Sequence, residues 1–251
     1  MKITILGSGT STGVPMVGCR CPVCSSPDPR DKRTRASILV ETGGHFILVD
    51  TSTDLRKQAI REQIPYIDAV LFTHSHADHI HGIDDLRGFH FIHQRLIPCY
   101  GSAETIATIA GNFSYIFKGL AVAEYAPLLE PHVLSEPLSL FDCHIVPVPL
   151  MHGDMAATGY RLNDAAYLTD CSSIPEQSMA LLSGLDLLII DALRYTPHRN
   201  HFNIEGALSV VEKLRPRRAV FTHLTHEIPY RDGVKLPEGV SLAYDGMALE
   251  C

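Results

Sequence analysis

The sequence predicts an α/β fold, built from short apolar strands that alternate with amphipathic helices. Two apolar runs, "DLLIIDA" (186–192) and "RAVFTHL" (218–224), are typical of strands that are buried on both faces. Between them, residues 203–214 repeat apolar side chains at helical spacing. No linker-like or low-complexity stretch interrupts this alternation. We therefore expect one domain over residues 1–251.

The first half of the chain predicts a hairpin followed by strand–helix units. A Gly-Gly pair at 43–44 lies between two apolar runs, which is typical of a β-hairpin. Leu55, Ala59 and Ile60 share one face of a helix. The expected elements are strands at 2–6, 36–42, 45–50, 68–73 and 97–101 and helices at 53–63, 82–95 and 101–117.

The second half begins with a proline-punctuated connection, residues 118–137. Pro147 and Pro149 cannot donate ladder hydrogen bonds, so the strand that holds them should lie at a sheet edge or end there. The expected elements are strands at 143–150, 186–192 and 218–224, a strand pair within 159–170, and the helix at 203–214.

Charge and hydropathy exclude some classes of partner. The formal net charge is −7, and the densest basic cluster is only "RPRR" (215–218), which disfavours binding to a phosphate backbone. No apolar run approaches the roughly 18 residues of a membrane span, and "MKITILGSGT" breaks too early for a signal peptide. We expect neither a nucleic acid nor a membrane as partner. The sequence leaves a homodimer open.

Cysteine usage indicates a reducing compartment. There are seven cysteines, an odd number, and three of them crowd into "CRCPVC". This pattern suits thiols and metal ligands better than a disulfide framework, so we expect a cytoplasmic protein.

The stretch "LFTHSHADHIHG" (71–82) concentrates metal-ligand residues directly after an apolar run. His74 and His76 are two residues apart and can project to one side at the end of a strand, and Asp78 and His79 can turn back towards the same point. Imidazole with carboxylate suits zinc, manganese or iron. Four such residues could serve two ions about 3.5–4 Å apart, as in two-metal hydrolytic sites.

Three later residues occupy equivalent positions. His152, Asp170 and His223 each follow or end an apolar run, and strand ends gather ligands in α/β folds. A single polar residue after a strand is usually a solvated turn, but the joint pattern favours a shared metal site.

Together, these residues resemble the metallo-β-lactamase superfamily, whose fold is an αββα sandwich with a binuclear metal site at one edge. The resemblance implies that His74, His76 and His152 hold one ion, that Asp78, His79 and His223 hold the other, and that Asp170 bridges them. The Asp bridge is similar to the phosphodiesterase and glyoxalase-type branches. Asp50, after "FILV", would match the carboxylate that orients a ligand histidine.

The segment "GCRCPVC" supplies a second candidate site. Cys19, Cys21 and Cys24 need a fourth partner for tetrahedral zinc, and His226 in "THLTHE" offers one. The alternative is a set of free reduced thiols. The cluster resembles the structural zinc site of the phosphoribosyl cyclic phosphate phosphodiesterases, the PhnP-like branch, and the PqqB biosynthetic proteins share part of it.

The glycine-rich stretch "GSGTSTG" (7–13) matches neither common nucleotide-binding motif. It lacks the Gly-Lys-Ser/Thr of a Walker loop, and Thr12 stands where the dinucleotide fingerprint needs its third glycine. A tight loop after the first strand is the better interpretation.

By the same resemblance, the protein is expected to be a metal-dependent phosphodiesterase with two active-site ions (Mn or Zn, with Fe as a further option) and one structural zinc. Its expected partner is a small cyclic phosphodiester, such as ribosyl 1,2-cyclic phosphate or a 2′,3′-cyclic nucleotide. Asp78 would orient the nucleophile and His201 would be the general acid, with His198 close enough to compete. The alternatives are a non-hydrolytic PqqB-like protein and another hydrolase of this fold, RNase Z-like or a thioesterase.

Overall fold

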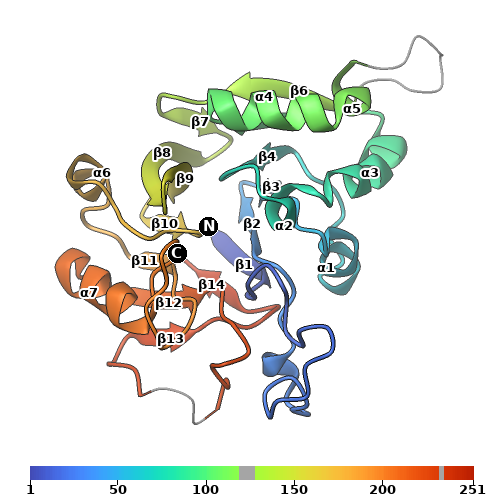
Figure 1. Cartoon of the computed structure of the whole chain (residues 1–251). Coiled ribbons are helices and arrows are strands. Elements are labelled where there is room, and N and C mark those ends of the chain that lie inside the picture. Colours follow the sequence, from blue (N-terminus) through green and yellow to red (C-terminus); the bar gives the residue numbers. More distant parts are fainter. Residues whose placement is uncertain (119–127, 232–234) are drawn as a thin grey trace.

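Two β-sheets packed face to face form the centre of the computed structural model, which describes residues 1–118, 128–231 and 235–251 (Figure 1). The first sheet runs, in spatial order, β14 (Ala248–Glu250), β1 (Lys2–Gly7), β2 (Ser37–Thr42), β3 (His45–Val49), β4 (Ala69–Leu71), β5 (Ile97–Gly101) and β6 (Leu129–Val133). The second runs β13 (Val240–Leu242), β12 (Arg218–Thr222), β11 (Leu187–Asp191), β10 (Ala165–Leu168), β9 (Met155–Leu162), β8 (Cys143–His152) and β7 (Leu138–Leu140).

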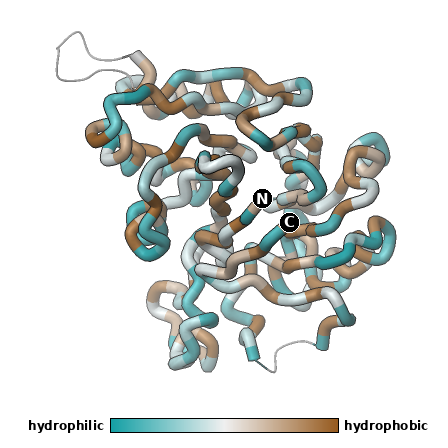
Figure 2. Tube along the Cα trace, turned by 180° about the vertical axis from the view of Figure 1, so that it is seen from behind, coloured by the Kyte–Doolittle hydropathy of each residue, from teal (hydrophilic) through white to brown (hydrophobic). Residues whose placement is uncertain are grey.

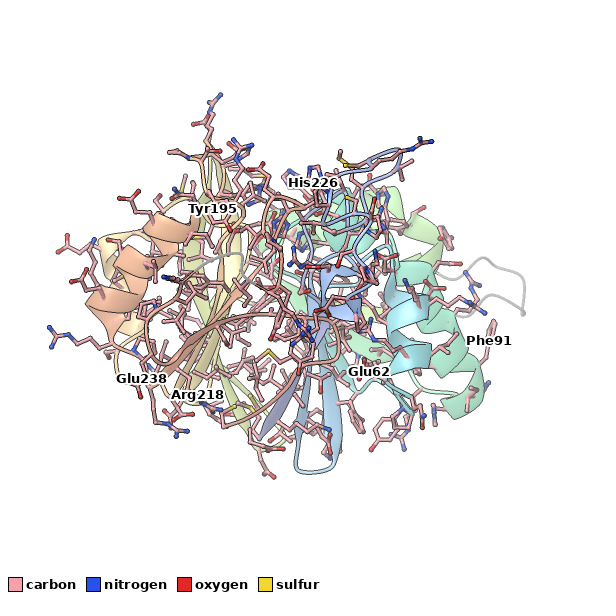
Figure 3. All side chains as sticks on the ribbon, turned by 90° about the horizontal axis from the view of Figure 1, so that it is seen from below. Glu62, Phe91, Tyr195, Arg218, His226 and Glu238 are labelled. Carbon is pink, nitrogen blue, oxygen red and sulfur yellow. The ribbon has the colours of Figure 1, made fainter. Side chains whose placement is uncertain are left out.

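Helices cover the outer face of each sheet. Figure 3 shows α7 outside the second sheet and α1 and α3 outside the first. The helices are α1 (Leu55–Arg61), α2 (Ala77–Ile80), α3 (Leu86–His93), α4 (Ala103–Asn112), α5 (Ser114–Lys118), α6 (Glu176–Leu181) and α7 (Ile204–Leu214), with 3₁₀ turns at Pro29–Asp31 and Ile83–Asp85. Along α4, hydrophobic and hydrophilic residues alternate in Figure 2, as expected for a helix with one buried face. No helix in the described ranges is long and apolar enough to cross a membrane.

The apolar core has three layers, because strand side chains alternate between the two faces of each sheet. Ile47 and Val49 of β3 point into the cluster between the sheets, where they join Tyr167 and Ile189 of the second sheet. Leu48, between them in sequence, points outward into the cluster beneath the helices on that side. The αββα sandwich expected from the sequence is therefore present.

Both sheets contain a run of parallel strands. In the first, β3, β4, β5 and β6 are parallel, and in the second β10, β11, β12 and β13 are parallel. The carboxyl ends of parallel strands meet at one edge of a sheet. Figure 3 shows the two ends of β12: Arg218 at its start and His226 beyond its end lie far apart.

Several elements differ from the prediction. The expected connection 118–137 contains the strand β6, while residues 119–127 lie outside the described residues. The helix expected at 101–117 is two helices, α4 and α5, because Phe113 at the end of α4 leaves helical backbone angles. The helix expected at 82–95 is shorter, and Gln94 ends it in a left-handed conformation. The strands β7, β13 and β14 and the helix α6 were not predicted.

The two prolines of β8 lie beyond the stretch that β7 covers. β7 pairs only with residues 143–145, whereas β9 pairs with residues 145–152. β8 is not the edge strand of its sheet, because β7 lies outside it. Pro147 and Pro149 nevertheless lie past the stretch that β7 pairs with, so the N–H groups that they lack are not needed on that side. The strand does not end at residue 150, however, but continues to His152.

Candidate metal centre

The candidate ligands converge at one edge of the sandwich because each follows or ends a strand there. His74 follows β4, His152 ends β8, Asp170 follows β10 and His223 follows β12. The backbones of Asp170 and His223 are left-handed, with φ of 52° and 59°. A left-handed residue turns the chain sharply, and in non-glycine residues this costs about 1–3 kcal/mol, so such positions mark sites where geometry matters.

His74, His76, His152 and Asp170 form the first half of the centre, with ligand atoms that lie within 4.8 Å of one another. Nε2 of His74 is 3.0 Å from Nδ1 of His76. The Oδ2 atom of Asp170 is 3.7 Å from Nε2 of both His74 and His152.

The second half, formed by Asp78, His79, His223 and Asp170, uses the other oxygen of the same aspartate. Oδ1 of Asp170 is 3.1 Å from Nε2 of His79 and 3.2 Å from Nε2 of His223. Oδ2 of Asp78 is 3.3 Å from Nε2 of His79. Asp170 thus presents one oxygen to each half, as a bridging ligand must. We refer to these seven residues as the histidine–aspartate cluster.

Orphaned polar atoms show that this cluster fits a cation. Nε2 of His79, Nε2 of His223 and Oδ2 of Asp78 are buried without a hydrogen-bond partner. A buried polar atom without a partner is costly, and metal ions would satisfy all three atoms. The donor set of imidazoles and carboxylates suits zinc, manganese or iron.

The electrostatics of the cluster also favour bound cations. Burial would raise the pKa of Asp170, but His223 and His79 outweigh it and hold this pKa well below its ordinary value. Burial would lower the pKa of His223, yet Asp170 and Asp78 raise it to about 9. The carboxylates therefore attract positive charge strongly, whether it comes from protons or from metal ions.

Outer hydrogen bonds fix the orientation of the candidate ligands. Asp50, buried with φ of 64°, accepts from Nδ1 of His79 at 2.8 Å and from the backbone N–H of Thr73 at 2.8 Å. Nδ1 of His152 donates to the carbonyl of Asn200 at 2.7 Å. Such partners fix the tautomer and leave Nε2 of each ring for a metal. The orienting position expected for Asp50 matches these contacts.

A second buried aspartate, Asp191 at the end of β11, adjoins the cluster. Its Oδ2 is 2.7 Å from Nδ1 of His201, and its Oδ1 is 4.0 Å from Nδ1 of His223. The rings of His201 and His223 are stacked with centroids 4.8 Å apart. The sequence interpretation missed Asp191, although it ends an apolar strand as Asp50 does, and that signal could have identified it.

His201 lies closer to the cluster than His198 does. The His201 ring is 4.6 Å from that of His152, whereas the His198 ring contacts His201 at 5.1 Å. Nδ1 of His198 accepts from the backbone N–H of Asn200. The ring of His201 thus lies between His198 and the histidine–aspartate cluster.

An open cavity of about 450 Å³ leads to the first half of the cluster. His76 and His152 form its inner wall, and Asp154 pairs with Arg199 at its rim. Both members of this pair are mostly exposed, at 84% and 76% of the side chain. A larger cavity of about 520 Å³ lies between α1 and α3 and contains none of the candidate ligands.

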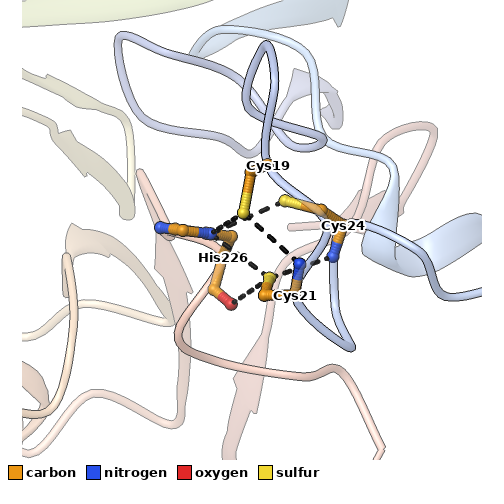
Figure 4. A group of neighbouring side chains, drawn as sticks. All are labelled: Cys19, Cys21, Cys24 and His226. Carbon is orange, nitrogen blue, oxygen red and sulfur yellow. Dashed lines mark hydrogen bonds between the residues drawn. The ribbon is translucent and has the colours of Figure 1, made fainter.

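Cys19, Cys21, Cys24 and His226, the thiol cluster, meet at a separate place (Figure 4). Nδ1 of His226 is 3.3 Å from the sulfurs of Cys19 and Cys21 and 3.6 Å from that of Cys24. Tetrahedral zinc with usual bond lengths separates nitrogen and sulfur ligands by about 3.5 Å. The arrangement therefore fits the expected zinc site and explains why three thiols crowd one loop.

A family model described as "Beta-lactamase superfamily domain" matches residues 45–224. This chain belongs to that superfamily. The matched range contains all seven residues of the histidine–aspartate cluster, whereas the thiol cluster lies outside it.

Comparison with solved structures identifies a narrower group within the superfamily. The crystal structure of a new diphosphatase from the PhnP family is 44% identical, covers 100% of this chain and 97% of that chain, and superposes with a TM-score of 0.92. The chain is therefore a PhnP-like protein with the metallo-β-lactamase fold. Zinc-bound PqqB from Methylobacterium extorquens superposes with a TM-score of 0.83 at 21% identity, with each chain covered completely, and shows the shared fold.

One curated relative is longer than this chain. An octanoyltransferase from Porphyromonas gingivalis is 37% identical to this protein over 98% of this chain. The chain spans about half of that relative, 51% of its length.

Proposed function

We propose that this protein is a binuclear-metal-dependent phosphodiesterase acting on a small cyclic phosphodiester, such as ribosyl 1,2-cyclic phosphate or a 2′,3′-cyclic nucleotide. The observation that carries the proposal is Asp170, whose two oxygens face two separate sets of ligand atoms. The similarity of this protein to a PhnP-family diphosphatase supports chemistry at phosphorus.

The cluster residues would hold the two ions, with Asp170 between them. Divalent ions bound there supply an activated water nucleophile at neutral pH and offset charge that develops on phosphoryl oxygens. Asp78, with one oxygen turned towards His79 and His223, keeps a second oxygen that can orient the attacking water. The exposed His76 borders the cavity through which a substrate would enter.

His201 would protonate the leaving oxygen. Asp191 holds its Nδ1, so the proton to be donated sits on Nε2. This contact favours His201 over His198 as the general acid.

The cavity fits a small substrate. A volume of about 450 Å³ lies in the range of small-molecule sites. The net charge of −7 does not suit a nucleic-acid chain, but metal ions can reverse the field locally for one small anion. The resident ions would be manganese or zinc, with iron as a further option, and the thiol cluster would hold one structural zinc.

A second candidate function is hydrolysis of an acyl thioester. The identity of 37% to half of an octanoyltransferase favours it. An octanoyl thioester therefore belongs in any test of activity.

The test is a substrate panel on protein loaded with manganese or zinc. It contains bis-p-nitrophenyl phosphate, 2′,3′-cyclic nucleotides, ribosyl 1,2-cyclic phosphate, a nucleoside diphosphate and an octanoyl thioester. We expect turnover of a phosphodiester. Cleavage of the thioester alone would establish the second candidate, and inactivity on all five would favour a non-hydrolytic, PqqB-like role.

Two variants connect activity to the cluster. Asp78→Asn and His76→Ala should reduce phosphodiester turnover by at least a thousandfold, because each removes a candidate ligand. The fold should survive, because Asn has the size of Asp and the side chain of His76 is exposed. His81→Ala is the matched control, since this exposed histidine of the same motif packs against Phe113 instead. Wild-type turnover in either cluster variant would contradict the ligand assignment.

A further inference from the structure

The segment that follows β12, residues 223–228, carries one residue of each cluster. His223 belongs to the histidine–aspartate cluster, and His226 belongs to the thiol cluster only three positions later. Figure 4 shows His226 facing the three cysteines of the N-terminal loop. A shift of this segment would therefore move ligands of both clusters at once.

Arg33 clamps this segment from inside the molecule. Its guanidinium donates to the carbonyl of Thr225 at 2.8 Å and to that of Ile228 at 2.7 Å. The side chain is fully buried, and its nearest carboxylate is that of Asp31, at 3.5 Å. Removing a guanidinium from water costs several kcal/mol, and its hydrogen bonds must offset that cost. Because Arg33 bonds to the carbonyls of both Thr225 and Ile228, the backbone between these two residues is constrained.

The backbone of Arg33 is tied to the thiol loop. Its N–H and carbonyl exchange hydrogen bonds with Val14 at 2.7 and 2.8 Å. The next residues of that loop approach the cysteines: the N–H of Met16 donates to the sulfur of Cys24 at 3.4 Å. Lys32 donates to the carbonyl of Cys24 at 3.0 Å.

The opposite side of the segment is fixed by the loop after β1 and the loop after β11. The N–H of Leu224 donates to the carbonyl of Ser8 at 2.9 Å, and the N–H of Thr225 donates to that of Leu193 at 2.9 Å. His223 itself has the left-handed φ of 59°, which holds only where its surroundings determine it. The position of its ring thus depends on contacts on both sides of residues 224–228.

We propose that Arg33 is a positioning residue that couples the two clusters. A metal ion in the thiol cluster fixes His226, and the segment clamped by Arg33 transmits that constraint to His223. The inference rests on the ligand assignment of the proposed function and goes beyond it. It concerns metal affinity, not the reaction.

Coupling of this kind is reciprocal. If an ion in the thiol cluster raises the affinity of the histidine–aspartate cluster by some factor, an ion in the latter raises the affinity of the former equally. Partners that orient metal ligands typically contribute 10- to 100-fold to metal affinity. We expect a factor of at least about ten.

Cobalt(II) titration distinguishes the two clusters in the whole protein without any assay of activity. Thiolate ligands give bound cobalt a sulfur-to-metal charge-transfer band, which histidines and carboxylates do not. Cys24→Ser and Arg33→Met should each weaken cobalt binding at the histidine–aspartate cluster about tenfold or more. Arg35→Met is the matched control, because this nearby guanidinium contacts Asp54 and Ser11 instead.

The double variant makes the test specific. If both changes act through the same segment, Cys24→Ser with Arg33→Met should weaken binding no more than the stronger single change does. Multiplied effects would show that the two residues act independently and would overturn the proposal.

Reciprocity provides a measurement that needs no variant. In the wild type, filling the histidine–aspartate cluster should raise cobalt affinity at the thiol cluster by the same factor, even if Arg33→Met does not fold. Equal affinity in both states overturns the coupling alone. Failure of the wild type to bind cobalt outside the thiol cluster overturns the coupling and the proposed function together.

Discussion

Left-handed backbone at Asp50, Asp170 and His223 places three polar side chains around one point. Each conformation costs free energy that surrounding contacts must offset. For Asp50 the compensation is visible, because its carboxylate accepts from Thr73 and from His79. The candidate centre is therefore built at a cost in folding stability, and that cost falls on these three residues.

Replacing Asp50 tests this compensation. Asp50→Asn should lower metal affinity about 10- to 100-fold, because a neutral amide no longer stabilises the His79 ring as a ligand. Asn also tolerates left-handed backbone, so the fold should persist. Competition with a metal-chelating dye measures the effect. Thr73→Ser, which keeps the hydroxyl, is the control, and an equal loss of affinity there would contradict the assigned role of Asp50.

The proposed acid, His201, predicts a dependence on the leaving group. His201→Ala should slow cleavage of an alkyl phosphodiester about 10²- to 10⁴-fold, because its poor leaving group needs a proton. A p-nitrophenyl ester needs no such help and should be affected far less. Asp191→Asn should show the same selectivity in a weaker form. Equal slowing of both substrates would assign His201 to binding instead.

At the scale of elements, α7 is anchored directly after the proposed acid. Asn203 caps the helix by accepting from the N–H of Gly206 at 3.0 Å, and its amide donates to the carbonyl of Tyr195 at 2.9 Å. The cap thereby closes the loop that carries His201.

Removing the cap should destabilise the protein. Asn203→Ala is expected to lower the free energy of unfolding by about 0.5–2 kcal/mol, as measured by denaturant titration. Asn203→Asp keeps the capping oxygen and should retain most of the stability. If Asn203→Asp loses as much stability as Asn203→Ala, the hydrogen bond from the side-chain amide to the Tyr195 carbonyl, and not the cap, provides the stabilisation.

Long apolar runs could be predicted from the sequence, whereas short elements could not. β11 (LLIID) and β12 (RAVFT) are mostly apolar, and the predicted ranges, 186–192 and 218–224, contain each strand with two residues to spare. β13 and β14 contain three residues each, too few for a period to emerge, and are defined by pairing with β12 and β1.

The candidate centre was more predictable than the fold around it. Residue types, spacing and the resemblance to the metallo-β-lactamase superfamily named the residues of both clusters, and the structure brings them together. That they bind metal ions stays a prediction. Arg33 could not be identified in this way, because nothing in its local sequence indicates a fully buried guanidinium. Its role arises from contacts with residues almost 200 positions away.

At the scale of the whole molecule, the thiol cluster joins the two ends of the sequence. Cys19 and His226 are 207 positions apart, and a bound ion would connect the N-terminal loop to the second sheet. Free metal at a thousand times its dissociation constant would stabilise the fold by about 4 kcal/mol.

A strong chelator should therefore lower the melting temperature of the metal-loaded protein by about 10 °C. Cys24→Ser should melt lower from the start and respond less to the chelator. Differential scanning calorimetry on both proteins provides the measurement. An unchanged melting temperature in the wild type would argue that the cysteines are free thiols.

The loop after β1 has a consequence for mutational tolerance. A Cβ on Gly7 would lie 1.9 Å from the carbonyl oxygen of Arg35, and one on Gly9 would lie 2.9 Å from the Cβ of Arg33. Even the smallest side chain would push this backbone away from the residues that carry the clamp. In a saturation screen, these two glycines should therefore be among the least replaceable positions of the chain, although neither offers a ligand, a proton or a charge.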